Sequence, residues 1–211
     1  MSTRSPWLKR IRFSAPELVE SFDGHPGEWI RLWVPDSSKG GLLRQRGYTV
    51  AGFSYEGGWF DIDVVLHSPD GPASAWARAV RPGAEVVISF SRPKEHLGGT
   101  EPLTLLADTS SLPAVEAICE HLAAGSREIR VFLDAQGHDV AGLLSAPGAR
   151  VVITEDPVAA FSSASPQEGG FVWAGLERSR VSALKAVLKA AGTPRSSVHA
   201  QAYWIKGRGF A

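Results

Sequence analysis

The chain has 211 residues, of which 44% are hydrophobic and 21% charged, a composition typical of a folded protein with a sizeable core. Lysine and arginine number 22, as do aspartate and glutamate, so no net charge attracts nucleic acid or an anionic membrane. The single cysteine, the lack of a long apolar run and the polar first residues lead us to expect a cytoplasmic protein without disulfides, membrane spans or a signal peptide.

The first half of the chain, up to about Phe90, consists of short extended segments separated by turn residues. Strands are predicted at residues 8–13, 29–34, 48–55, 59–66 and 85–90. Gly57 and Gly58 lie between two of them and predict a hairpin, because glycine tolerates the positive φ of tight turns. With only one short helix expected, this half predicts an antiparallel β-barrel or β-sandwich.

Pro93, the Gly98-Gly99 pair and mixed charges predict a linker, and we place a domain boundary between residues 95 and 96. Beyond it, strands and helices alternate. Strands are predicted at residues 103–107, 129–133, 150–154, 171–175 and 198–204, and helices from about 113 and 180, near 140 and near 158. Such alternation implies βαβ crossovers, so residues 96–211 are expected to form a mostly parallel α/β domain.

The helix predicted from Arg180 has the clearest signals. Its apolar residues fall on one face, Ser179 is expected to cap its start, and Gly192 followed by Pro194 is expected to end it. The apolar stripe of this helix is therefore expected to face the core.

The usual enzyme signatures are missing. The six histidines are scattered without a His-Glu-x-x-His pattern or companion cysteines, so we expect no dedicated metal site. The chain also lacks the Gly-x-Gly-x-x-Gly and Walker patterns of common nucleotide sites. No side chain is assigned as a catalytic acid, base or nucleophile.

The first half does carry an Arg-x-Tyr-Thr pattern at Arg46, Tyr48 and Thr49. The Arg46 guanidinium suits pyrophosphate oxygens, the Tyr48 ring suits an isoalloxazine and the Thr49 hydroxyl suits a flavin edge. Strand alternation places Arg46 and Tyr48 on the same face. The simpler alternative is a surface arginine beside a core tyrosine.

A second pattern, Gly71-Pro72-Ala73-Ser74, follows His67 at the end of a predicted strand. Proline favours the first turn of a helix, and the exposed N–H groups of that turn attract an anion. Taken alone, the pattern is also an ordinary helix start, and His67 is also consistent with a structural histidine.

Taken in order, these segments resemble the siderophore-interacting proteins, which are flavin-dependent ferric-siderophore reductases related to the ferredoxin-reductase fold. The resemblance lies in residues 46–49, 63–67, 71–76, 82–85, 105–114, 173–179 and 203–207. It implies an FAD-binding β-barrel in residues 1–95, an NAD(P)H-binding domain in residues 96–211 and a ferric siderophore as substrate.

The resemblance also implies functional residues in the second half. The expected cofactor-binding residues there are Asp108, Thr109, Ser110, Glu177 and Trp204. Lys206 and Arg208 are candidates for a basic patch facing an anionic chelate, although a solvated tail is an equal alternative.

Two residues depart from the family pattern in the second half. Ala107 directly precedes Asp108 where relatives have glycine, and Leu176 stands where relatives have glycine. Nucleotides bind at the carboxyl ends of parallel strands, so side-chain bulk added there is expected to hinder the approach of NAD(P)H. We therefore predict poor use of NAD(P)H. The alternatives are an FAD-binding protein with weak or no NAD(P)H turnover, or a flavin reductase with a different acceptor or with ferredoxin as donor.

Overall fold

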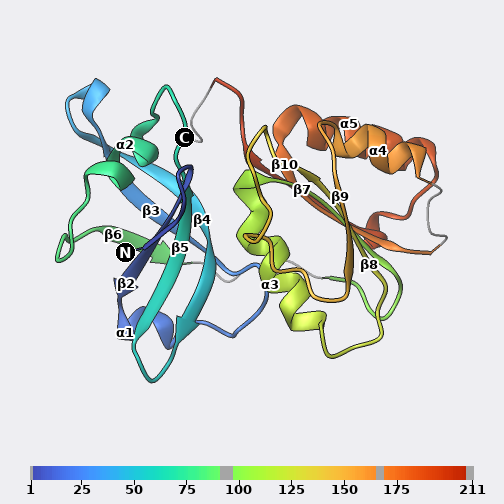
Figure 1. Cartoon of the computed structure of the whole chain (residues 1–211), viewed down its shortest axis with the longest axis horizontal. Coiled ribbons are helices and arrows are strands. Elements are labelled where there is room, and N and C mark those ends of the chain that lie inside the picture. Colours follow the sequence, from blue (N-terminus) through green and yellow to red (C-terminus); the bar gives the residue numbers. More distant parts are fainter. Residues whose placement is uncertain (1, 91–96, 165–168, 208–211) are drawn as a thin grey trace. The chain divides into compact units, whose positions relative to one another are not determined.

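The computed structural model describes residues 2–90, 97–164 and 169–207 (Figure 1). The chain divides into two compact units, and the first range lies in one while the other two ranges lie in the second. The expected boundary between residues 95 and 96 falls outside the described residues. Within the described ranges, no helix is both long and apolar enough to cross a bilayer.

The first unit is a barrel-like antiparallel sheet of six strands in the order β1-β2-β5-β4-β3-β6. The strands are β1 (Ser2–Ser5), β2 (Leu8–Ser14), β3 (Trp29–Asp36), β4 (Leu42–Ser54), β5 (Trp59–Val65) and β6 (Val87–Phe90). The helical segments are α1 (Pro16–Val19), η1 (Ser37–Lys39) and α2 (Pro72–Ala79). Among the described strands, β1 and β6 do not pair with each other, so the sheet stays open.

The core of the first unit lies on one face of this sheet. Alternate β3 residues Ile30, Leu32 and Val34 are fully buried in it, as period-two alternation requires. Helix α2 packs against β3 and β5 and adds Ala73 and Ala77 to the same cluster. The helix and the core-facing side of β3 are therefore parts of one packed layer.

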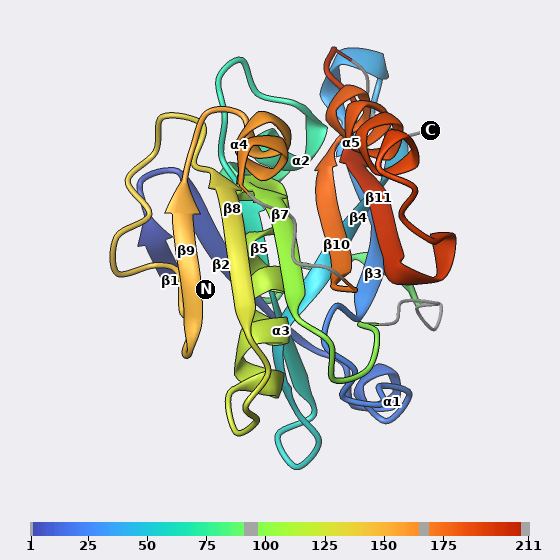
Figure 2. The ribbon, with the colours of Figure 1, turned by 90° about the vertical axis from the view of Figure 1, so that its right-hand side faces the viewer.

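The second unit is a parallel sheet of five strands in the order β11-β10-β7-β8-β9 (Figure 2). The strands are β7 (Leu103–Asp108), β8 (Ile129–Asp134), β9 (Ala149–Ile153), β10 (Phe171–Glu177) and β11 (Val198–Trp204). The helical segments are η2 (Thr109–Ser111), α3 (Leu112–Leu122), α4 (Pro157–Ser163), α5 (Arg178–Ala190) and η3 (Arg195–Ser197). Within this unit α3 lies on one side of the sheet, and α4 and α5 lie on the other (Figure 1).

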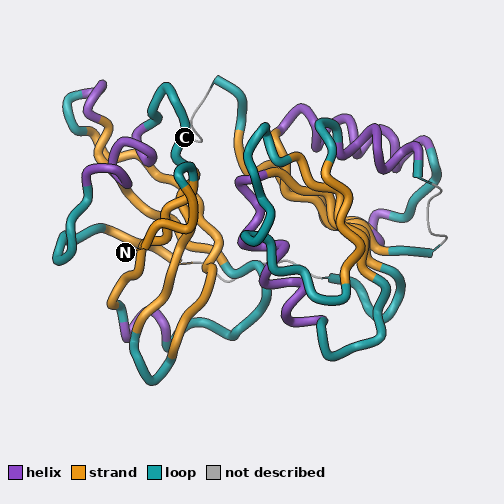
Figure 3. Tube along the Cα trace, viewed as in Figure 1, coloured by secondary structure: helices purple, strands orange, loops and turns teal. Residues whose placement is uncertain are grey.

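The expected fold class, an antiparallel barrel-type unit followed by a parallel α/β unit, is confirmed by this architecture, although the described strands of the first unit do not close into a barrel. The short helix expected near residue 140 is wrong, because the chain forms turns there (Figure 3). The Asp139 carboxylate accepts a hydrogen bond from the Ala141 N–H at 2.9 Å, and Gly142 has a positive φ of 72°. Both features favour a turn over a continued helix.

Candidate functional site

The first group of predicted site residues lies on β4. The β3–β4 register pairs Arg46 with Leu32 and Tyr48 with Ile30, so both side chains occupy the core-facing side of the sheet, as alternation predicted. Thr49 pairs with Trp29 and therefore points to the opposite side. The structure thus brings Arg46 and Tyr48 together and does not bring the Thr49 side chain to their face.

Tyr48 lies at the border between core and solvent. Its half-buried ring packs against the apolar cluster that includes α2 residues, and burial raises the pKa of its hydroxyl while the positive charge of Arg46 opposes the rise. Arg46 is also half-buried, and its Nη1 donates to the Gln45 carbonyl at 2.7 Å. A cation and a partly covered aromatic ring therefore share one face.

The second group surrounds the start of α2. Gly71 is the residue before the first helical residue, has extended backbone and offers no side-chain cap to the N–H groups of the first turn. A Cβ at Gly71 would lie 3.3 Å from Cε1 of His67, so the exposed histidine ring crosses close to this position. Pro72, Ala73 and Ser74 follow as the first helical turn.

The loop before α2 is held by hydrogen bonds of its own. Ser74 Oγ donates to Asp70 Oδ1 at 2.6 Å and Arg78 Nε donates to the same oxygen at 3.1 Å, and these bonds lower the pKa of Asp70, that of Ser74 most. His67 Nδ1 lies 2.7 Å from the Pro69 carbonyl oxygen. The sequence pattern from His67 to Ser74 therefore folds as one ordered turn leading into the helix.

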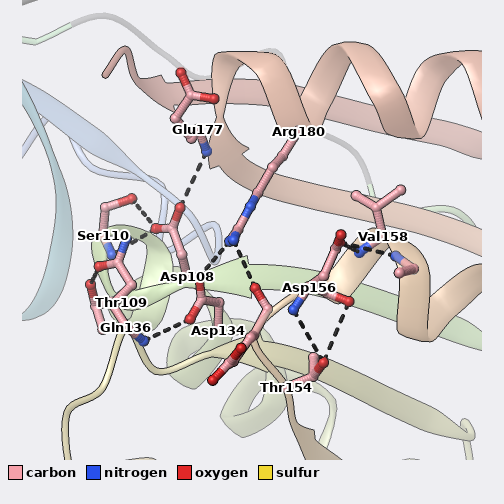
Figure 4. A network of polar contacts seen from close by, with 12 residues as sticks. Asp108, Thr109, Ser110, Asp134, Gln136, Thr154, Asp156, Val158, Glu177 and Arg180 are labelled. Carbon is pink, nitrogen blue, oxygen red and sulfur yellow. Dashed lines mark hydrogen bonds and ion pairs between the residues drawn. The ribbon is translucent and has the colours of Figure 1, made fainter. Parts of the chain in front are cut away.

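The third group lies at the carboxyl edge of the parallel sheet, where open α/β sheets bind their ligands. The last residues of four strands meet at this edge: Asp108 of β7, Asp134 of β8, Glu177 of β10 and Trp204 of β11. Figure 4 shows polar contacts of Asp108, Asp134 and Glu177 at this edge.

Asp108 ties three strands together. Its Oδ2 accepts hydrogen bonds from Trp204 Nε1 at 2.8 Å and from the Glu177 N–H at 3.2 Å. Its Oδ1 accepts hydrogen bonds from the Ser110 N–H at 2.9 Å and from the Ser110 hydroxyl. The carboxylate is fully buried, and burial raises its pKa against the opposing effect of these bonds. Both oxygens are engaged inside the protein, so the side chain positions the loop that follows β7.

Glu177 caps α5, and the expectation that Ser179 would do so is wrong. Glu177 Oε2 accepts from the Ser179 N–H at 2.6 Å and from the Ser179 hydroxyl, and Oε1 accepts from the Lys206 N–H at 3.2 Å. These bonds, that of the Ser179 hydroxyl most of all, lower the pKa of Glu177. The Lys206 side chain is exposed, and Arg208 lies outside the described residues.

Three residues at this edge were missed by sequence reasoning. These residues are Asp134, Gln136 and Arg180. Asp134 Oδ2 accepts a hydrogen bond from Arg180 Nη1 at 2.5 Å, and Asp134 Oδ1 accepts one from the Gln136 N–H at 2.7 Å (Figure 4). The Thr109 hydroxyl donates to the Gln136 side chain. Arg180 Nη2 also donates to the Glu155 carbonyl at 2.7 Å. For Asp134 the available signal was an acidic residue directly after the predicted strand 129–133, as Asp108 follows 103–107, since the ends of parallel strands meet at one edge.

The expected crowding by Leu176 is wrong. The Leu176 side chain is fully buried in the cluster formed with Val181 and Leu184 of α5, so it points into the core. The close approach occurs one residue earlier, because a Cβ on Gly175 would lie 2.8 Å from atoms of Ser111, Trp173 and Tyr203. Ala107, paired with Gly175, is likewise fully buried. These positions therefore do not narrow a ligand site.

Among the described residues, no cluster of three or more histidine, cysteine or carboxylate side chains is arranged to hold a metal ion. The polar groups described above are instead hydrogen-bond donors and acceptors, among them the half-buried cations of Arg46 and Arg180.

Two family models match the chain. The model "Siderophore-interacting FAD-binding domain" covers residues 41–95, and the model "Siderophore-interacting protein" covers residues 100–207. The first match includes Arg46, Tyr48 and the start of α2, and the second includes the whole carboxyl edge described above.

Similar proteins have been described in several bacteria. The mycobactin import ATP-binding/permease protein IrtA of Mycobacterium tuberculosis is 30% identical over 97% of this chain and 25% of its own length. The ferric vibriobactin reductase ViuB of Vibrio cholerae is 24% identical over 60% of this chain and 53% of its own length. The chain thus spans about a quarter and about half of these two relatives.

A solved structure has the same fold over almost the whole chain. The siderophore-interacting protein SipS from Aeromonas hydrophila superposes with a TM-score of 0.76 at 27% identity, covering 97% of this chain and 88% of its own.

Proposed function

Because the chain belongs to the siderophore-interacting protein family, we propose that it is an FAD-dependent reductase that passes electrons from NAD(P)H to a ferric siderophore. The observation that carries the proposal is the match of the FAD-binding domain to the segment holding the Arg46–Tyr48 face and the start of α2. We assign FAD to residues 1–95 and the nicotinamide dinucleotide to residues 96–211.

The residues of the first unit fit an FAD. Arg46 offers a cation for the pyrophosphate, and the Tyr48 ring offers a partly covered surface for the isoalloxazine. The first turn of α2 has no side-chain cap, which suits an anion, and His67 stands beside it. The FAD-binding set in this proposal is Arg46, Tyr48, His67, Gly71, Pro72, Ala73 and Ser74, without Thr49, whose side chain points to the opposite side of β4.

When bound, FAD supplies the redox chemistry, accepting a hydride and giving up electrons to iron. The protein's part is to bind and orient: Arg46 and the α2 start neutralise the pyrophosphate, and Tyr48 sets the position of the ring. Reduction favours iron release, because the hard oxygen donors of a siderophore hold Fe(II) far less firmly than Fe(III).

In the second unit, the carboxyl edge of the sheet is the proposed site for NAD(P)H. Thr109 and Ser110 form the turn after β7, while Asp108, Glu177 and Trp204 fix the strand ends that flank it. The exposed Lys206 side chain, with Arg208, is the proposed contact for an anionic ferric chelate.

The test uses the full chain reconstituted with FAD. We expect a flavin absorption spectrum, bleaching of that spectrum on addition of NADH or NADPH, and formation of Fe(II), trapped by a ferrous chelator, when a ferric siderophore is added. A chain that shows no flavin spectrum after reconstitution contradicts the whole proposal. Bleaching by reduced ferredoxin and not by NAD(P)H would leave FAD binding intact and replace the electron donor.

A further inference from the structure

The β3–β4 hairpin carries two exposed leucines where β4 begins. Leu42 is 63% exposed and Leu43 is 53% exposed, and they directly follow Gly40 and Gly41, both of which have positive φ. Covering a large, water-exposed apolar side chain with a ligand is favourable, because it removes apolar surface from water. A short helical turn, η1, lies at the tip of this hairpin (Figure 3).

The two leucines face opposite sides of the strand. The β3–β4 register is regular along this stretch, pairing Asp36 with Leu42, Val34 with Arg44, Leu32 with Arg46 and Ile30 with Tyr48. Because residues two apart share a face, Leu42 and Arg44 lie on the same side of β4 as Arg46 and Tyr48. Leu43 lies on the other side.

Arg44 is held beside Leu42. Its Nε lies 3.3 Å from Oδ2 of Asp36, the cross-strand partner of Leu42, while 42% of the Arg44 side chain stays exposed. Guanidinium planes and apolar side chains are both surfaces on which a nucleic-acid base stacks. The two side chains therefore form one platform on the face that carries Arg46.

The order of these residues along β4 follows the order of the parts of FAD. Six residues separate Tyr48 from Leu42, which is about 20 Å of strand, with Arg46 between them. A ligand whose ring lies at Tyr48 and whose pyrophosphate lies at Arg46 extends its remaining half toward Arg44 and Leu42. We propose that Leu42 and Arg44 form the subsite for the adenosine half of FAD, an inference that rests on the proposed FAD binding.

The test compares FAD with FMN, which lacks the adenosine half. Dissociation constants for both are measured by flavin fluorescence on the full chain. We expect the unmodified protein to prefer FAD, and Leu42→Ser to weaken FAD binding about fivefold, the effect of losing roughly half of a leucine's burial, with FMN binding unchanged. Arg44→Lys, which keeps the charge and removes the planar group, is expected to lower the same preference.

Leu43→Ser is the matched control, because it makes the same change at a neighbouring residue of similar exposure on the opposite face. It should leave both dissociation constants unchanged, and thermal unfolding should show that all variants remain folded. Equal losses in the two serine variants, or no loss in Leu42→Ser, would overturn the subsite. Equal binding of FAD and FMN by the unmodified protein would overturn it and leave the proposed function standing, whereas binding of neither flavin would overturn both.

Discussion

At the scale of single residues, two carboxylates at the same sheet edge have pKa values shifted in opposite directions. Burial raises the pKa of Asp108, whereas hydrogen bonds led by that of the Ser179 hydroxyl lower the pKa of Glu177. The contribution of Asp108 to the stability of the fold is therefore fully present at low pH, and it is lost as pH rises through the raised pKa. Glu177 contributes stability above its ordinary pKa and loses it as pH falls through the lowered one.

Glu177→Gln should reveal that pH dependence. At pH 7 we expect the variant to be less stable by about 0.5 kcal/mol, because glutamine keeps an acceptor for the Ser179 N–H but loses the negative charge that the helix N-terminus favours. The difference should shrink as pH falls below about 4.5, the ordinary glutamate value, because the unfolded state is protonated first, and it should vanish once pH is below the lowered pKa of the folded state. Urea unfolding at several pH values measures this, with the exposed Glu56→Gln as control. A difference that stays constant down to pH 3 would mean that the charge does not cap α5.

Arg46→Ala should weaken FAD binding by about 1.5 to 3 kcal/mol, or at least about tenfold, if the guanidinium binds the pyrophosphate. Lys39→Ala, which removes an exposed cation from the same hairpin, is the control and should leave the affinity unchanged. Isothermal calorimetry with FAD gives both values. An Arg46 variant with unchanged affinity would mean that the guanidinium does not bind FAD.

At the scale of elements, the sequence predicts most strands and the main helices because their periodicity comes from burial on one or two faces. Predicted strand 198–204 matches β11, and predicted strand 8–13 misses only the last residue of β2. The errors occur where a local contact decides. Glu177 caps α5 through a long side chain reaching the Ser179 N–H, and the Asp139 turn replaces a helix near residue 140.

The candidate site was also predictable only in part. The shared face of Arg46 and Tyr48 follows from strand alternation alone, and the structure has it. The pairing of Asp134 with Arg180 joins residues 46 positions apart, and no local pattern encodes such a contact. Similarly, a motif comparison cannot tell that Leu176 points into the core, because the direction depends on which face of β10 α5 covers.

Leu176→Ala should therefore destabilise the protein by about 2 to 5 kcal/mol, since it leaves a cavity against α5. It should not improve the use of NAD(P)H. Ile153→Ala in the same sheet is the control, because that residue is 54% exposed and should cost little. Urea unfolding measures the stability, and faster flavin reduction by NADPH in the Leu176 variant would contradict this assignment.

At the scale of the whole molecule, each described unit has its own buried apolar residues, and the charge of the chain is balanced. One cluster forms around β3, β5 and α2, another forms between the parallel sheet and α4 with α5, and fully buried residues such as Leu105, Val115 and Ile118 lie outside both. The 22 basic and 22 acidic residues leave a formal net charge of zero. Any attraction to an anionic chelate must therefore come from a local group of side chains.

We accordingly expect no binding of the full chain to double-stranded DNA at physiological salt, because non-specific binding depends on neutralising phosphates with excess cations. A gel-shift titration checks this, with a basic protein of similar size as the positive control. Retardation that weakens steeply with added salt would show that the cations are concentrated on one surface after all.

The missing helix between β8 and β9 has a consequence for how the protein behaves when concentrated. Among the described strands β9 pairs only with β8, and Val151 and Ile153 stay exposed at 37% and 54%. A sheet margin with free backbone groups and apolar side chains is a template onto which another chain adds a strand. The exposed charge of Arg150, the second residue of β9, opposes such addition. Replacing Arg150 with an apolar residue should therefore turn this margin into a starting point for aggregation, seen as rising light scattering during storage.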